Sequence, residues 1–257
     1  MAHRFSETSA CSSWFNLAHR MNRWAHKFAY AEKEIEIEGN GLSDIKVLTI
    51  ILFFRALTNF QGSIVVADRG LIVEARALAR CCGESALCMV GAKFDPEHWK
   101  ALIQDEIKSR KGRARLLFGN THWLTDEQHE KLKSQVAAMS ADWNRLSGLD
   151  YEKISQKGGC EIHYVIYRQL SADSAHASFE SLFRYVTEKD GIEGLQPAPK
   201  ISPEMICETI DIGCNFLFLC GAVATEHFPD EAASKEMHAC WEEYKVLTQN
   251  RRAALQS

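Results

Sequence analysis

Apolar residues recur every three or four positions along most of the chain, a period that is typical of amphipathic helices. The first such stretch runs from about Thr8 to Glu38, and its repeating apolar positions are Trp14, Leu17, Met21, Trp24 and Phe28. The run Gly39-Asn40-Gly41 then breaks the pattern. We therefore divide the chain into a tail and helical arm, residues 1–40, and a helical bundle domain, residues 41–257. The arm is expected to pack either on this bundle or on a second subunit.

Potential capping residues mark where the other helices begin. They are Ser43 with Asp44 in the first turn, Asp95 followed by Pro96, Thr125 three residues before Gln128, and Ser202 followed by Pro203. Two polar stretches that contain glycine, Ser109–Trp123 and Lys189–Lys200, are expected to be loops. No pair of strands is indicated. The pattern predicts an all-α protein, a single bundle of about seven to nine helices.

The longest apolar runs, Val47–Phe54 and Ile212–Ala224, are too short by themselves to cross a bilayer. We therefore expect core helices and no membrane partner. The second run belongs to a helix predicted over Ile206–Ala224, and a helix that is apolar all round is typical of the centre of a bundle.

The helix predicted over Arg69–Gly91 mixes charges with apolar residues. Arg76, Arg80 and Glu84 fall on one stripe at helical spacing, and Arg80 and Glu84 are four residues apart and able to pair. The stripe is either a surface ion pair on a half-exposed helix or a polar cluster inside the bundle. The second alternative requires partners from other helices, because buried charges must be paired.

The composition narrows the classes of function. The chain has 257 residues, of which 46% are hydrophobic and 25% charged, an ordinary soluble globular composition. A net charge of -4 provides no general basic field for nucleic acid. The nine cysteines form no C-x-x-C motif, and the first residues lack the apolar region of a signal peptide. A cytoplasmic protein with free thiols is therefore expected.

No metal or cofactor motif is complete. Cys160 and His163 could form half of a metal site, but no second half follows at the usual spacing, so we expect neither a metal nor a cofactor. A cysteine nucleophile stays open as an alternative, because Cys81 and Cys82 directly follow Arg80.

Two motifs together resemble a known family. The first, E-A-R-A-L-A-R-C-C-G-E, spans Glu74–Glu84, and the second, Y-V-I-Y-R-Q-L-S-A-D-S-A-H, spans Tyr164–His176. In their order and separation the two motifs resemble those of a bacterial all-helical family, domain of unknown function family 5677, and the resemblance covers about residues 45–184. The resemblance implies a fold rather than an activity. It also implies that a set of polar residues meets in space: Arg80, Glu84, Tyr167, Ser171 and His176.

Such a cluster could bind a ligand or act on it. A buried arginine requires a carboxylate, which Glu84 or Glu74 can supply, and a histidine near a carboxylate titrates near neutral pH. We expect catalytic roles for His176, Arg80, Glu84 and Arg168, and ligand-binding roles for Arg76, Glu74, Tyr167 and Ser171. The alternative is a polar network that only fixes helix register.

A more distant analogy is to the HEPN superfamily of helical nucleases and nucleotide-binding proteins. These proteins carry an arginine, then four to six residues, then a histidine, usually at a dimer interface. Arg168 and His176 have seven residues between them, one more than this pattern allows, whereas Arg115 with His122 and Arg20 with His26 fit it formally. A histidine that acts as general base or general acid, together with an arginine that binds the phosphate, suits metal-independent RNA cleavage.

Two hypotheses follow. The first is a cytoplasmic bacterial protein, a homodimer by analogy, that binds RNA or a nucleotide-like ligand and acts as a ribonuclease in phage defence. The second is a non-catalytic interaction protein. In that case the polar cluster is structural, and the aromatic arm Trp14–Tyr30 binds a partner or closes a homodimer.

Overall fold

The computed structural model describes residues 4–31, 41–118, 124–138, 148–175, 178–189 and 192–256. Within these ranges the chain forms ten α-helices: α1 (Ser12–Tyr30), α2 (Ile45–Asp68), α3 (Ile72–Phe94), α4 (His98–Phe118), α5 (Asp126–Ala138), α6 (Tyr151–Gly158), α7 (Glu161–Leu170), α8 (Phe179–Phe183), α9 (Pro203–His227) and α10 (Glu231–Gln256). A short antiparallel hairpin, β1 (Val186–Lys189) and β2 (Ile192–Leu195), lies between α8 and α9. The prediction of an all-α bundle is confirmed.

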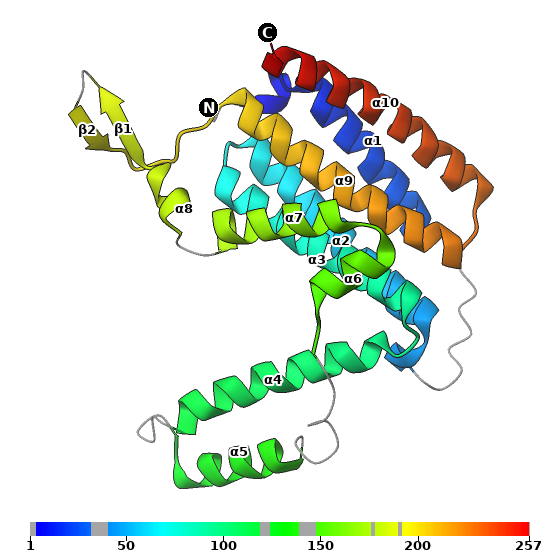
Figure 1. Cartoon of the computed structure of the whole chain (residues 1–257), viewed down its shortest axis with the longest axis vertical. Coiled ribbons are helices and arrows are strands. Elements are labelled where there is room, and N and C mark those ends of the chain that lie inside the picture. Colours follow the sequence, from blue (N-terminus) through cyan, green and yellow to red (C-terminus); the bar gives the residue numbers. More distant parts are fainter. Residues whose placement is uncertain are drawn as a thin grey trace.

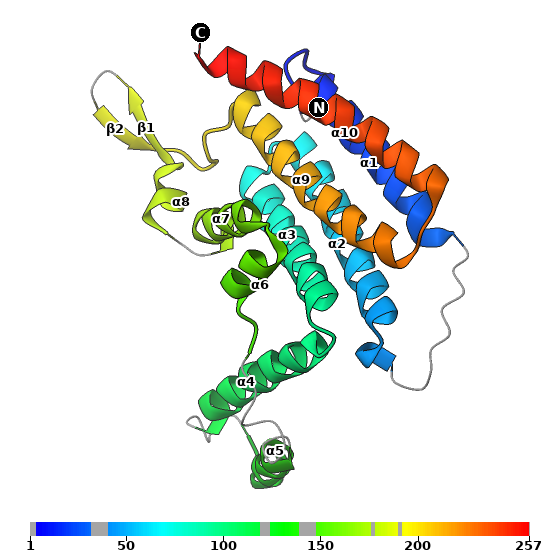
Figure 2. The ribbon, with the colours of Figure 1, turned by 45° about the vertical axis from the view of Figure 1, so that its right-hand side comes forward.

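Three long helices, α2, α3 and α9, form the centre of the bundle, and α1 and α10 cover one side of it (Figure 1). Helices α6 and α7 lie against α3. Two segments project away from this body: α4 with α5 at one end, and α8 with the hairpin at the other (Figure 2).

The turn between α2 and α3 depends on Gly70, whose φ of +74° is a left-handed conformation that favours glycine. The helix predicted from Arg69 therefore begins at Ile72, and it continues past Gly91 to Phe94. The helix predicted over Ile206–Ala224 is longer as well, because α9 begins at Pro203 and ends at His227.

The capping residues are largely those predicted. Ser202 accepts a hydrogen bond from the Met205 amide at 3.3 Å, and Thr125 and Gln128 form a reciprocal capping box. The cap of α2 is Asp44 rather than Ser43, because the Asp44 carboxylate accepts the amides of the first turn.

The aromatic residues of the N-terminal arm are part of the same core. Trp14, Trp24 and Phe28 of α1 are almost fully buried, and α1 contacts α2, α9 and α10. The Trp24 indole also donates a hydrogen bond to the Ala233 carbonyl at 2.8 Å, which ties α1 to α10. Of the two packing alternatives for the arm, the structure shows packing on the bundle.

Two segments differ from the loops that were expected. The basic stretch from Ser109 is helical as far as Phe118, because Arg110 and Arg113 both reach Glu106 and support the α4 helix across Gly112. The rest of that stretch, residues 119–123, lies outside the described residues. The hairpin was also missed, although its two strands flank the sequence Asp190-Gly191, which is typical of a two-residue hairpin turn.

Helices α2 and α9 are 24 and 25 residues long, and both reach a mean hydropathy of 1.6, so each is long and apolar enough to cross a membrane. The apolar runs alone are too short for a bilayer, but the helices that contain them are not. Inside the bundle, 50% of the apolar window of α2 and 72% of that of α9 are buried. Core helices of soluble proteins pass the same test, so these two helices are weak evidence for a membrane.

Helices α3 and α9 pack closely against each other at Gly83. A Cβ atom added there would lie 2.6 Å from the Phe216 ring, which is itself fully buried. We expect Gly83→Ala to lower the free energy of unfolding by about 1–3 kcal/mol, because a packed core resists an extra methyl group. Gly112→Ala is the control: that site in α4 is open, so the substitution should raise stability by about 0.5–1 kcal/mol. Urea denaturation measures both, and equal effects would contradict the close approach.

Candidate functional site

A closed cluster of charges surrounds Arg76. Its guanidinium bonds the Asp173 carboxylate at 2.5 Å, Glu208 at 2.7 Å and the Thr209 hydroxyl at 3.2 Å. Arg184 pairs with the second oxygen of Asp173. Arg76 is 8% exposed and Asp173 is 3% exposed, so this pair is shut off from solvent, whereas Glu208 lies at the edge of the cluster with 43% of its side chain exposed.

The local backbone explains how Asp173 reaches Arg76. After α7 the chain widens into one π-helical turn, Ser171–Ala175, which lies against α3. Such turns are rare and re-aim side chains within a helix. Here the turn directs Asp173 inward, between Arg76 of α3 and Arg184, which directly follows α8. The cluster holds two arginines and two acids, so its charges balance, and its closed geometry matches the structural alternative for Arg76.

A second, more open cluster surrounds Arg80, one turn along α3. Its Nε donates to the Ser171 hydroxyl at 2.8 Å, and one terminal nitrogen donates to the Tyr167 hydroxyl at 2.9 Å. The predicted pair with Glu84 is present at 3.5 Å, and Glu84 also lies 3.8 Å from Arg55. The Arg80 side chain is 22% exposed, so solvent reaches this cluster.

Tyr167 connects the Arg80 cluster to a groove. The Arg80 guanidinium carbon lies 4.9 Å from the centre of the Tyr167 ring, which is an attractive cation–π position. Burial raises the pKa of the Tyr167 hydroxyl, so the phenol stays neutral and accepts the hydrogen bond from Arg80.

The groove beside Tyr167 lies between α4, α6 and α7 and has a volume of about 460 Å³. Three cations and three aromatic rings line it: Lys108, Lys153, Arg168, Tyr151, Tyr164 and Tyr167. The Tyr167 ring lies 5.2 Å from that of Tyr151 and 6.5 Å from that of Tyr164, so the rings form one aromatic wall. Cations beside an aromatic wall suit a ligand that has both phosphate groups and a planar ring.

The residues expected to form one site thus divide into several groups. Arg80, Glu84, Tyr167 and Ser171 do come together, whereas Arg76 belongs to the closed cluster. Arg168 is exposed on the groove side of α7, and Glu74 is exposed on the first turn of α3, where it pairs with no cation of either cluster in the described part of the chain. His176 and His122, the histidine of the basic stretch, both lie outside the described residues, so the catalytic role expected of His176 stays a prediction.

Sequence reasoning missed several residues of these clusters. Asp173 stands inside the second motif, but nothing in the pattern distinguished it from a solvated acid. Glu208, Thr209 and Arg184 lie on elements far along the chain from Arg76. Tyr167 was predicted, but Tyr164 was missed although it had a usable signal, because the three-residue spacing places both rings on one face of a helix.

Comparison with known proteins identifies a family and nothing closer. The model of a family of unknown function, DUF5677, matches residues 46–193, which is more than half of the chain. This match covers both motifs and agrees with the resemblance expected from them. No curated protein and no solved structure matches the chain. The analogy to HEPN proteins therefore rests on the sequence spacing alone.

The two clusters should respond differently to loss of a charge. We expect Asp173→Asn to lower the free energy of unfolding by about 3–5 kcal/mol, because it leaves two buried arginines short of a carboxylate. Glu84→Gln is the matched control and should cost about 1 kcal/mol or less, since Glu84 is partly exposed and its pairs are longer. Urea denaturation measures the free energy of unfolding of both variants. Similar decreases in the two would contradict a special structural role for the Arg76 cluster.

Proposed function

The chain belongs to the DUF5677 family, a family of unknown function, and we propose that this member binds a phosphate-bearing, nucleotide-like ligand in the groove between α4, α6 and α7. RNA is the polymer that fits this proposal best. The observation that carries it is the set of three cations beside three tyrosine rings in one open groove.

The charges of the groove favour an anion. Among the described residues that line it, the one acid is Asp150, which caps α6 by accepting the Lys153 amide at 3.1 Å and pairs with the Lys153 ammonium group at 3.2 Å. Lys108 and Arg168 form no ion pair with any residue that the structure describes. Both cations are exposed and can neutralise phosphate, although the whole chain carries a net charge of -4.

The tyrosines supply the second half of the recognition. Each base that stacks on an aromatic ring contributes about 1–3 kcal/mol, whatever its sequence. Burial raises the pKa of both Tyr151 and Tyr167, so their rings stay uncharged beside a phosphate. Arg80 contacts Tyr167 through a hydrogen bond to its hydroxyl and a cation–π contact with its ring. These contacts fix the orientation of a ring on which a base would stack.

The enzymatic form of the proposal is metal-independent RNA cleavage. In this form His176 acts as acid–base, and Arg80 or Arg168 holds the phosphate. Arg80 is the weaker candidate for the phosphate-binding arginine, because its guanidinium nitrogens already donate hydrogen bonds to Ser171 and Tyr167. The same proposal places the protein in the bacterial cytoplasm, as a homodimer that acts in phage defence.

The alternative is a non-catalytic interaction protein whose polar cluster is structural. The closed Arg76 cluster favours a structural role for that part of the network. The arm that would bind a partner has less support, because Trp14, Trp24 and Phe28 are buried inside the bundle.

Binding can be measured by fluorescence anisotropy with a labelled single-stranded RNA. We expect Lys108→Ala and Arg168→Ala each to weaken binding about threefold to tenfold and to make the affinity less dependent on salt, because each removes one phosphate contact. Lys235→Ala is the control, since that exposed lysine lies on α10 and pairs with Glu231. An affinity that neither groove variant changes would exclude the groove as the binding site.

Cleavage is tested with the same RNA in the presence of EDTA, with wild type beside His176→Ala. We expect the wild type to cleave and the variant to lose at least about a hundredfold in rate, the usual contribution of a general acid or base. Binding without cleavage in the wild type would refute the enzymatic form and leave the binding proposal intact.

A further inference from the structure

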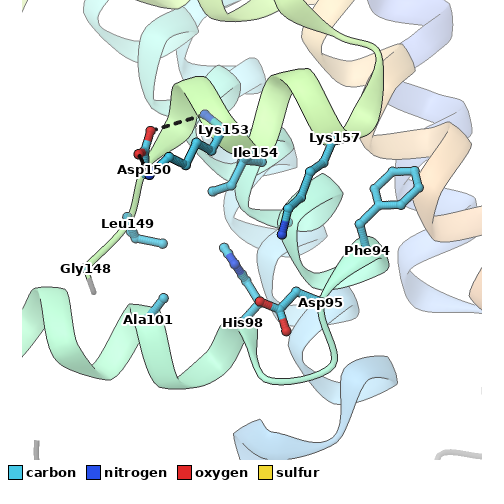
Figure 3. Close-up of a pocket in the computed structure, with 11 residues that line it drawn as sticks. Phe94, Asp95, His98, Ala101, Gly148, Leu149, Asp150, Lys153, Ile154 and Lys157 are labelled. Carbon is cyan, nitrogen blue, oxygen red and sulfur yellow. Dashed lines mark hydrogen bonds and ion pairs between the residues drawn. The ribbon is translucent and has the colours of Figure 1, made fainter. Parts of the chain in front are cut away.

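A second, smaller cavity adjoins the groove. It lies between the start of α4 and helix α6, has a volume of about 130 Å³, and is lined by His98, Lys153 and Lys157 among others (Figure 3). We propose that this cavity, which we call the His98 pocket, binds a terminal phosphate monoester. The proposal rests on the function proposed for the groove, because it identifies one end of the ligand held there.

His98 has an unsatisfied nitrogen. The side chain is 4% exposed, and its Nε2 is buried with no hydrogen-bond partner among the residues that the structure describes. Figure 3 shows the imidazole pointing into the space between α4 and α6. A buried polar atom without a partner costs about 1–3 kcal/mol, and an acceptor placed in the pocket would remove this cost.

The position of the ring is fixed by its neighbours. The His98 ring packs against Gly91 of α3, where an added Cβ atom would overlap it. Burial lowers the pKa of His98, whereas the nearby Asp95 carboxylate opposes this shift. In the empty pocket the imidazole is therefore neutral near pH 7, and one of its nitrogens can donate a hydrogen bond to a phosphate oxygen.

Helix α6 supplies the positive charge. Lys157 points across the pocket toward His98 (Figure 3), and it forms no ion pair within the described parts of the chain. The two carboxylates of the lining are already engaged. Asp95 accepts the Glu97 amide at 2.9 Å, and Asp150 accepts the amide and the ammonium group of Lys153. The ammonium group of Lys157 and the Nε2 atom of His98 are therefore the groups left for a ligand.

The pocket and the groove share one wall. Gly148, Leu149, Asp150 and Lys153 line both cavities, so the two lie side by side along the start of α6. The volumes differ, about 130 Å³ against 460 Å³, and the aromatic rings lie in the larger space. A phosphate group fits the small pocket, while the bases of the same ligand reach the tyrosines. Free phosphate has the same chemistry, and the test must separate these two sources.

The test compares one RNA sequence with a phosphate at its 5′ end, at its 3′ end or at neither end, each with an internal fluorophore. We expect the wild type to bind one phosphorylated form about tenfold more tightly than the unmodified RNA, as a charge-assisted contact provides. Lys157→Ala should abolish this preference and leave the affinity for unmodified RNA unchanged. His98→Gln should reduce the preference, and Lys235→Ala should retain it.

Inorganic phosphate, titrated calorimetrically, separates the two proposals. If RNA binds equally in all three forms and inorganic phosphate does not bind, the His98 pocket is refuted and the groove stands. If inorganic phosphate binds and Lys157→Ala removes this binding, but no RNA binds, the pocket stands and the function proposed for the groove fails. Lys157 is exposed, so its variant tests the pocket even if His98→Gln weakens the packing against Gly91.

Discussion

The pairing of Arg76 with Asp173 is the constraint on which the arrangement of the site depends. A guanidinium that is 8% exposed must meet a carboxylate, and Asp173 reaches it because the chain forms a π turn after α7. The same turn places Ser171 against Arg80, and α7 then presents Tyr167 to the same arginine. The buried charge of Arg76 thus helps to fix the position of Tyr167, which lines the groove.

Neighbouring arginines of α3 have different roles in this account. Arg76 is engaged by two carboxylates and a hydroxyl, and Arg184 pairs with one of these carboxylates from the other side. Arg80 is partly exposed and acts through Tyr167, which it holds from behind. The groups that could touch a ligand lie farther out, on α4, α6 and α7, where cations and tyrosines share a groove. The clusters around Arg76 and Arg80 therefore position the residues of the groove, and the proposed ligand contacts lie in the groove itself.

The sequence predicted what depends on spacing along one helix. The Arg80–Glu84 pair, the buried stripe of α1 and the caps of α5 and α9 all follow from neighbours in the chain. The partners of Arg76 did not, because Asp173 and Glu208 stand 97 and 132 residues away and only the fold brings them in. The groove was missed for the same reason: Lys108 of α4 and the tyrosines of α6 and α7 have no common period.

In the proposed function the ligand lies in the groove between α4, α6 and α7. Photocrosslinking tests it most directly, with a short RNA that carries 4-thiouridine and with peptide mapping by mass spectrometry. We expect adducts on peptides from residues 148–168, which carry all three tyrosines that line the groove. Adducts confined to α1, α5 or α10 would contradict it, since these helices do not line the groove.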